Sequence, residues 1–215
     1  MKPRALLLGT LSFCVLWFLG WEAWAVYDAR QKTPAIFAPF QDGAALTITW
    51  DDLSARQQAI LLTVEDPRFF QHGGVDIQTP GAGITTITQA LAKRLYFEKF
   101  TPGFAKIEQT LIAMMVINPL VTKEVQINTF LNVAYFGTDD GDRIIGFPHA
   151  ARRYIGTPIE EMNDLAFVRL VAMLIGPNRY RPGTAPHDER TGRIMALLRG
   201  DCAPSGNRDV EYETC

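Results

Sequence analysis

Apolar residues recur at helical spacing along the middle and the C-terminal part of the chain. The first such helix is introduced by Ser54 with Gln57 three residues later, a capping-box pattern that marks the start of many helices. Asp66 stands directly before Pro67, and a residue in that position avoids helical geometry, so the helix is predicted to end near Glu65. Glu65 is therefore expected at the end of an apolar helix.

The same signals predict a mostly α domain with little sheet. Caps, apolar stripes and helix breakers predict helices over residues 86–96, 103–118, 122–137, 148–156, 165–175 and 188–198. Glycines and prolines interrupt residues 71–84, and aspartates and glycines make residues 138–146 polar, so both stretches are predicted as loops. Residues 45–50 are the one short strand that the pattern allows.

The N-terminal stretch has a different pattern, that of a membrane segment. Residues 5–21 are 17 residues without a charge, and as a helix they span roughly 26 Å, just enough to cross a bilayer. Lys2 and Arg4 precede them, so the positive-inside bias places the N-terminus in the cytoplasm. The alternative is a cleaved signal peptide, because residues 23–25, Ala-Trp-Ala, fit a cleavage site. Both interpretations place the rest of the chain outside the cytoplasm.

Length and composition are consistent with one domain and one additional segment. We predict a cytoplasmic tip and transmembrane anchor over residues 1–27, a stalk and lead-in over 28–53, a helical domain over 54–200 and a polar tail over 201–215. The net charge of −2, without clustered basic residues, argues against a nucleic-acid partner. Cys202 and Cys215 share the tail, where they form either a disulfide, in an oxidising compartment, or two free thiols.

Glu65 is the main candidate for chemistry. A carboxylate at the point where an apolar helix opens into a cleft loses solvation, which raises its pKa and suits it to proton transfer near neutral pH. The alternative is a solvated surface ion pair, since most Glu-Asp pairs are exposed. His72 shares no metal-ligand spacing with His149 or His187, so we expect a hydrogen bond that braces the loop rather than a metal site.

Several stretches of the chain match, in order, the motifs of a known family. They are Glu-Asp-x-x-Phe-x-x-His-x-Gly-x-Asp at residues 65–76, Gly-Ile-Thr-Thr-Ile-Thr-Gln-Ala at 83–90, the stretch ending in Leu-Asn-x-x-Tyr-Phe-Gly at 123–137, Ala-Ala-x-x-Tyr-x-Gly at 150–156 and Pro-Asn-Arg-Tyr-x-Pro at 177–182. Over roughly residues 55–200 the chain resembles the peptidoglycan glycosyltransferases of glycosyltransferase family 51. The resemblance is to the monofunctional biosynthetic peptidoglycan transglycosylases, since no Ser-x-x-Lys motif of a transpeptidase is present.

The resemblance implies a fold, a reaction and a location. The fold is a lysozyme-like helical glycosyltransferase domain with a membrane-dipping small lobe, preceded by one N-terminal transmembrane helix. The reaction polymerises lipid II into glycan strands and releases undecaprenyl pyrophosphate. The location is the cell inner membrane, crossed once, with the catalytic domain on the periplasmic side. The implied partners are lipid II, the nascent glycan strand, the membrane and cell-wall assembly proteins.

The resemblance also assigns roles to residues. Glu65 is the general base that deprotonates the 4-hydroxyl of the acceptor sugar. The residues expected to bind substrate are Arg68, Thr86, Gln89, Lys93, Lys106, Glu108 and Gln109, the basic ones because a pyrophosphate leaving group needs fixed positive charge. No cofactor is certain, although a divalent cation, magnesium or manganese, is compatible with the pyrophosphate.

The third motif departs from the family pattern, Arg-Lys-x-x-Glu, and leaves other functions open. Ala105 stands at the arginine, Lys106 at the lysine and Gln109 at the glutamate, with Glu108 next to it. Smaller departures are Ile84, Ala90 and Asn128 at positions of glycine, glutamine and glutamate. One alternative is therefore a non-catalytic scaffold protein of cell-wall assembly. A muramidase is another, and it would need a second carboxylate, for which Asp76 is the nearest candidate.

Overall fold

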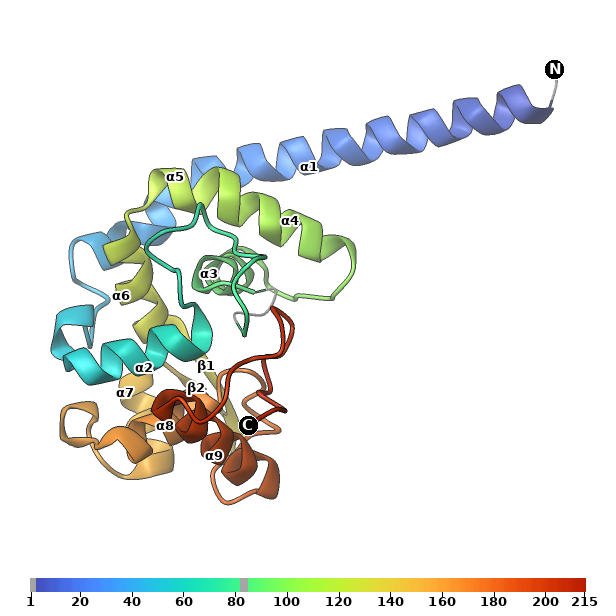
Figure 1. Ribbon diagram of the computed structural model, residues 1–215. Helices are drawn as coiled ribbons and strands as arrows, with labels where there is room; N and C mark the ends of the chain where they lie inside the picture. The colour runs from blue at the N-terminus through green and yellow to red at the C-terminus, as the bar shows by residue number, and fades with distance from the viewer. Residues whose placement is uncertain (1–2, 82–84) are drawn as a thin grey trace.

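The structure is a computed structural model that describes residues 3–81 and 85–215. Lys2, and Gly83 and Ile84 of the second motif, lie outside the described residues. Figure 1 shows a helical body from which the N-terminal half of one long helix, α1, projects. The prediction of a mostly α fold is confirmed.

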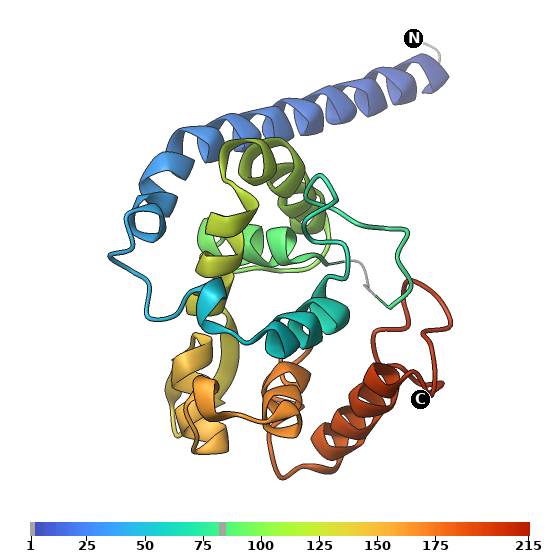
Figure 2. The same ribbon diagram turned by 60° about the vertical axis from the view of Figure 1, so that its left-hand side comes forward.

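The helices and strands follow one another along the chain, and the long loop between Glu65 and Ile87 connects α2 to α3. The helices are α1 Pro3–Gln41, α2 Ala55–Glu65, α3 Ile87–Tyr96, α4 Phe104–Ile112, α5 Asn118–Leu120, α6 Lys123–Val133, α7 Phe147–Ala150, α8 Asp164–Ala172 and α9 Ala185–Arg199, and the strands are β1 Tyr135–Asp139 and β2 Asp142–Ile145. Figure 2 shows α1, α3 and α4 at one end of the body, α8 and α9 at the other, and α2 between them. One continuous apolar core joins the two ends.

Helix α1 is longer than the sequence pattern predicts. Residues 28–41, expected as a stalk, continue the helix through Pro34 and Pro39. Ala29, Thr33 and Phe37 recur at spacings of four and are buried against the body, so tertiary packing outweighs the proline penalty. Within the described residues, no helix has both the length and the apolar character that a bilayer crossing requires.

Two helix starts near the cleft have the predicted capping boxes. Ser54 accepts the Gln57 N–H at the start of α2, and Thr86 accepts the Gln89 N–H at the start of α3. Helix α2 ends at Glu65, as the Asp-Pro step predicts. Local side-chain signals thus fix both ends of the helix that carries the candidate base.

The stop predicted at Asn118-Pro119 is displaced. After α4, a π-helical turn over Ala113–Ile117 leads into α5, which ends only at Leu120. Pro119 has no N–H to donate one turn back, and the carbonyl of Met115 instead accepts a hydrogen bond from Arg30 Nη1 of α1 at 2.8 Å. A side chain remote in sequence therefore satisfies the carbonyl four residues before the proline, and the helical path continues.

The stretch 138–146, predicted as a polar loop, contains the end of β1, the turn and the whole of β2 in a β-hairpin. Strands β1 and β2 pair antiparallel, with Thr138 opposite Arg143 and an irregularity between Tyr135 and Thr138. The aspartates made this stretch look like a loop in the sequence because they form ion pairs instead of facing a core: Asp139 pairs with Arg153 and Arg181. Residues 45–49, in turn, form no strand.

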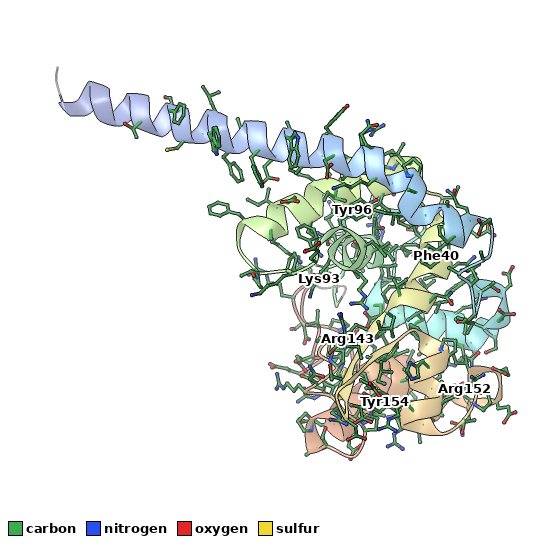
Figure 3. All side chains as sticks on the ribbon, turned by 180° about the vertical axis from the view of Figure 1, so that it is seen from behind. Phe40, Lys93, Tyr96, Arg143, Arg152 and Tyr154 are labelled. Carbon is green, nitrogen blue, oxygen red and sulfur yellow. A yellow bond between two sulfur atoms is a disulfide. The ribbon has the colours of Figure 1, made fainter. Side chains whose placement is uncertain are left out.

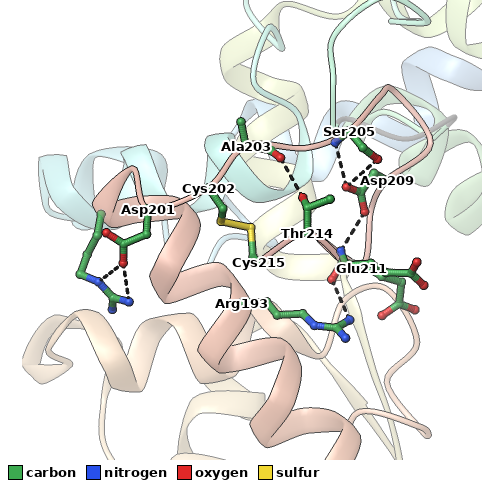
Figure 4. Close-up of a disulfide and its surroundings, with 11 residues drawn as sticks. Arg193, Asp201, Cys202, Ala203, Ser205, Asp209, Glu211, Thr214 and Cys215 are labelled. Atoms are coloured by element: carbon green, nitrogen blue, oxygen red, sulfur yellow. Dashed lines mark hydrogen bonds and ion pairs between the residues drawn. A yellow bond between two sulfur atoms is a disulfide. The ribbon is translucent and has the colours of Figure 1, made fainter.

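The predicted polar tail is a folded part of the domain. Of the two predicted alternatives for Cys202 and Cys215, a disulfide or two free thiols, the structure has the disulfide (Figure 4). Tyr212 is fully buried, and its hydroxyl donates to the carbonyl of Val64 at 3.1 Å. The tail is thus attached to the residue that precedes Glu65.

Candidate active site

Glu65 lies in a cleft between the two ends of the body. Its walls come from the end of α2, the start and outer face of α3, the β1–β2 hairpin, α9 and the C-terminal tail, and its volume is about 600 Å³. The charged residues that line it are Glu65, Lys93, Arg94, Glu98, Arg143 and Arg190. Glu65 therefore borders an open cleft, as a catalytic role requires.

The Glu65 carboxyl group is suited to accept a proton near neutral pH. Burial raises its pKa from 4.5 to about 7, against the opposing attraction of Arg190 and with a smaller contribution from the negative charge of Asp66. Within the described part of the chain, no ion pair or hydrogen bond engages the Glu65 side chain. The predicted alternative, a surface ion pair, does not describe this residue.

A hydrogen-bond network fixes the backbone behind Glu65. Asp66 is fully buried and accepts hydrogen bonds from the N–H of Ile87 at 3.0 Å and from His72 Nε2 at 2.9 Å. His72 Nδ1 in turn accepts the N–H of Gly74 at 3.0 Å, which leaves the ring proton on Nε2. Asp66 and His72 therefore join the end of α2 to the start of α3, and His72 braces the loop as predicted.

Two arginines that sequence reasoning missed face the cleft around Tyr135. The guanidinium groups of Arg94, on α3, and Arg143, on β2, lie 5.7 and 5.5 Å from the centre of the Tyr135 ring. Burial and the nearby charge of Arg143 lower the pKa of Arg94. Neither arginine has an ion pair with a carboxylate among the described residues. Figure 3 shows Arg143 and Lys93, which line the same cleft, so this wall of the cleft carries unneutralised positive charge.

A model of the transglycosylase family matches residues 35–199, which include every wall of the cleft except the tail. The chain belongs to the transglycosylase family. It is 31% identical over 173 residues to the biosynthetic peptidoglycan transglycosylase of Azoarcus sp. (strain BH72), covering 71% of this chain and 73% of that protein. The corresponding protein of Laribacter hongkongensis (strain HLHK9) is 28% identical over 202 residues, which are 84% of this chain and 86% of that protein.

Other relatives are much longer proteins. Penicillin-binding protein 1B of Buchnera aphidicola subsp. Acyrthosiphon pisum (strain APS) is 31% identical over 151 residues, which are 64% of this chain and 20% of that protein. The chain thus spans about one fifth of the length of these relatives. The family that the motifs indicated is confirmed.

The transglycosylase cleft brings together three of the eight predicted site residues: Glu65, Thr86 and Lys93. Lys106 lies at its border, where its Nζ donates to Thr85 Oγ1 at 2.7 Å. Arg68 is exposed, bonds to Gln71 and does not line the cleft. The substrate-binding role of these residues remains a prediction.

Thr86 and Gln89 have a visible structural use. Besides forming the capping box, the Thr86 hydroxyl donates to the carbonyl of Gly74 at 2.7 Å, and Gln89 Nε2 donates to Thr110 Oγ1 at 3.0 Å. Gln89 is buried and lies behind the cleft wall rather than in it. The Thr-x-x-Gln spacing of the second motif therefore builds the start of α3, whose N-terminal end borders the cleft.

Glu108 and Gln109 of the diverged third motif do not line the cleft with Glu65. Gln109 is fully buried under α3, where its Nε2 donates to the carbonyl of Gln89 at 2.6 Å. Glu108 faces α1 and lines a second cavity together with Trp21 and Trp24, which adjoins the cleft at Arg94, Phe97 and Glu98. Because consecutive residues of a helix point about 100° apart, α4 directs one side chain inward and the other toward α1. Both residues were predicted to bind substrate, but the structure places neither of them in the cleft with Glu65.

The cleft supplies few protein ligands for the divalent cation that the resemblance implies. Magnesium and manganese take about six oxygen ligands, which usually come from one or two carboxylates, from water and from the phosphates of a substrate. The acidic groups that line the cleft are Glu65 and Glu98, and they share it with Lys93 and three arginines. No group of three or more potential ligands gathers anywhere among residues 3–81 and 85–215. We assign no step to a metal ion.

Proposed function

We propose that this transglycosylase polymerises lipid II into glycan strands with Glu65 as its general base. The observation that carries the proposal is an unpaired Glu65 carboxyl group, whose pKa burial raises to about 7, in a cleft that is also lined by Lys93, Arg94 and Arg143. The relatives named above as biosynthetic peptidoglycan transglycosylases support the same substrate class.

The proposed reaction is a single displacement with inversion. The acceptor 4-hydroxyl transfers its proton to the Glu65 carboxylate as its oxygen attacks the anomeric carbon of the donor chain. The bond from that carbon to the pyrophosphate breaks, and its electron pair leaves with undecaprenyl pyrophosphate. Lys93, Arg94 and Arg143 stabilise the charge that develops on the leaving group.

The arrangement favours transfer over the two alternatives. Hydrolysis by a muramidase needs a second carboxylate across the bond. The predicted candidate, Asp76, accepts hydrogen bonds from Thr79 and the Gln78 N–H in its own loop and lies outside the cleft. Glu98 does line the cleft, but it is exposed beyond the end of α3 and shares the lining with Lys93 and Arg94, which suits the cleft to an anionic leaving group. A non-catalytic scaffold agrees with the diverged third motif. It gives no reason for an unpaired base with raised pKa facing unneutralised arginines, however.

We further propose that the domain works outside the inner membrane, with the N-terminal half of α1 as its membrane segment. Large apolar side chains are exposed along this projecting helix, among them Trp17 and Trp21. Phe104 and Ile107 of α4 are also exposed, and the Phe104 ring lies 5.4 Å from that of Phe18, so one apolar surface extends from α1 to the domain. The disulfide agrees with an oxidising compartment. Cell-wall assembly partners remain a prediction.

The pH dependence of polymerisation tests the proposal. A general base must be ionised, so the rate is expected to rise with pH through a midpoint near 7 and to be about tenfold lower at pH 6 than on the plateau. An exposed glutamate would place this midpoint near 4.5. The measurement is the initial rate of glycan formation from labelled lipid II between pH 5 and 9. Absence of polymer at every pH would contradict the proposed function and favour the scaffold.

Replacing Glu108 tests whether the third motif takes part. Because its side chain faces α1 and not the cleft, Glu108→Gln is expected to leave the polymerisation rate close to that of the parent. Glu108 also raises the pKa of the buried Glu22, after burial itself, so the variant is expected to unfold at an equal or higher temperature. The same assay measures the rate, and a thermal melt measures the unfolding temperature. A large loss of rate in Glu108→Gln would show that Glu108 does take part in the reaction.

A further inference from the structure

The C-terminal segment that the disulfide closes, residues 202–215, lies beyond the family match and forms part of the cleft (Figure 4). Val210 of this segment lines the same cleft as Glu65. The segment is also bonded to the loop after α2: the carbonyl of Gly206 accepts the N–H of Gly81 at 2.9 Å, and Asn207 Nδ2 donates to the carbonyl of Ile77 at 2.7 Å. The segment therefore has contacts that a disordered tail would lack.

Arg190 of α9 is the side chain that this segment holds most closely. Its Nη1 donates to the carbonyl of Val210, and its Nε donates to the carbonyl of Ala172 at 3.2 Å. The guanidinium group also contacts two rings, at 5.8 Å from the centre of Tyr180 and 5.5 Å from that of Tyr212. These contacts fix the orientation of the side chain.

Arg190 is a buried cation without a salt bridge. It is only 2% exposed, and among the described residues no carboxylate lies within ion-pair distance of it. Burying an isolated charge is costly unless an opposite charge is near. The carboxylate that shares the cleft lining with Arg190 and feels its charge is that of Glu65.

We propose that Arg190 is a positioning residue for the general base: the disulfide-closed segment fixes its guanidinium group in the cleft lining that it shares with Glu65, where its charge stabilises the ionised carboxylate. The inference deepens the proposed function and rests on it. It also assigns a role to residues 202–215, which are bonded to Arg190 and to the backbone of α2.

The other groups around Glu65 define what Arg190 adds. Asp66, tied to His72 and approached by Lys123, disfavours ionisation of Glu65, as burial does. Tyr212 stays neutral, because burial raises its pKa further than Arg190 lowers it. Lys93, Arg94, Glu98 and Arg143 also line the cleft, but they are not among the charges that shift the pKa of Glu65. Arg190 is the cation that lowers the pKa of Glu65.

Titration of the Glu65 carboxyl carbon by NMR, assigned with Glu65→Gln, measures the effect without substrate. In Arg190→Gln the midpoint is expected to rise by about one pH unit, the usual result of removing a nearby opposite charge. Arg190→Lys is expected to return it toward the parent value. The matched control is Arg193→Gln: Arg193 lies one turn further on α9 and donates to the carbonyl of Glu211 in the same segment, but it does not line the cleft.

A measurement on the parent protein covers the case in which Arg190→Gln does not fold. The Nε–H signal of Arg190 is expected to move with pH at the midpoint of Glu65, and this movement should vanish in Glu65→Gln. The inference is overturned if the chemical shift of the Arg190 Nε–H does not change when Glu65 ionises. An unchanged Glu65 midpoint in folded Arg190→Gln, or an equal rise in Arg193→Gln, also overturns it. The NMR titrations do not require that the protein be active. If the parent protein forms no glycan, the proposed function is contradicted, and the titrations still decide the inference about Arg190.

Discussion

Glu65→Gln is expected to stop glycan polymerisation and, above pH 7, to make the protein more stable than its parent. Glutamine keeps the size of the side chain but cannot take the proton of the acceptor hydroxyl. The loss of a general base lowers a rate by roughly 10²- to 10⁴-fold. The gain in stability follows from burial, because an amide escapes the cost of ionisation in the cleft.

The stability effect has a defined pH window. The pKa of Glu65 is about 7 in the folded protein against 4.5 for a free side chain. Below pH 4.5 the group is protonated in both states and costs nothing. As pH rises toward 7, the unfolded state loses its proton first, and the parent loses stability by up to about 3 kcal/mol. Glu65→Gln is therefore expected to match the parent at pH 4.5 and to exceed it at pH 8.

Urea unfolding at the two pH values, together with the lipid II assay, measures both effects. Glu124→Gln is the matched control, because Glu124 is an exposed glutamate in the first turn of α6, away from the cleft. Retained polymerisation in Glu65→Gln would remove the general base from the proposal. An equal gain in stability at both pH values would show that the carboxyl group is not held with a raised pKa.

Features that depend on neighbours in sequence could be predicted from the chain. The capping boxes at Ser54 and Thr86 and the Asp-Pro step after Glu65 placed the ends of helices correctly, because the groups that make those bonds lie within three residues of one another. The same locality explains the prediction for His72, whose partner Asp66 belongs to the same motif. Glu65 and its desolvated surroundings followed from these signals.

Features that depend on the direction of a side chain or on distant pairing could not be predicted. Alignment of the third motif fixes a position along α4 but not which of Glu108 and Gln109 faces inward. Arg143 reaches the cleft only through the pairing of β1 with β2. The pattern predicts a helix over residues 188–198 but not that Arg190 on it is buried, and the tail that contacts Arg190 has a polar composition. Composition alone does not distinguish polar residues that form such internal hydrogen bonds from polar residues that face solvent.

Removing both arginines around Tyr135 is expected to have the second largest effect on activity. Arg94 and Arg143 supply the unneutralised charge of the wall proposed to receive the pyrophosphate. Loss of one preorganised electrostatic contact to a transition state costs roughly 10²- to 10³-fold. The double variant Arg94→Ala/Arg143→Ala is therefore expected to lose at least about 10²-fold in kcat/KM. Its pH midpoint should stay near that of the parent, because Glu65 is unchanged.

The two single variants separate charge from shape. Both guanidinium groups contact one ring, so the effects of Arg94→Ala and Arg143→Ala are expected to be non-additive in a double-mutant cycle. Arg152→Ala is the control: Arg152 is exposed and lies on the π-helical segment Ala151–Ile155, away from Lys93 and Arg143 in Figure 3. Arg143→Lys retains the charge without the planar group and should keep part of the activity. If the double variant polymerises lipid II like the parent, or loses no more than Arg152→Ala, the leaving group binds elsewhere and the assignment of this wall is wrong.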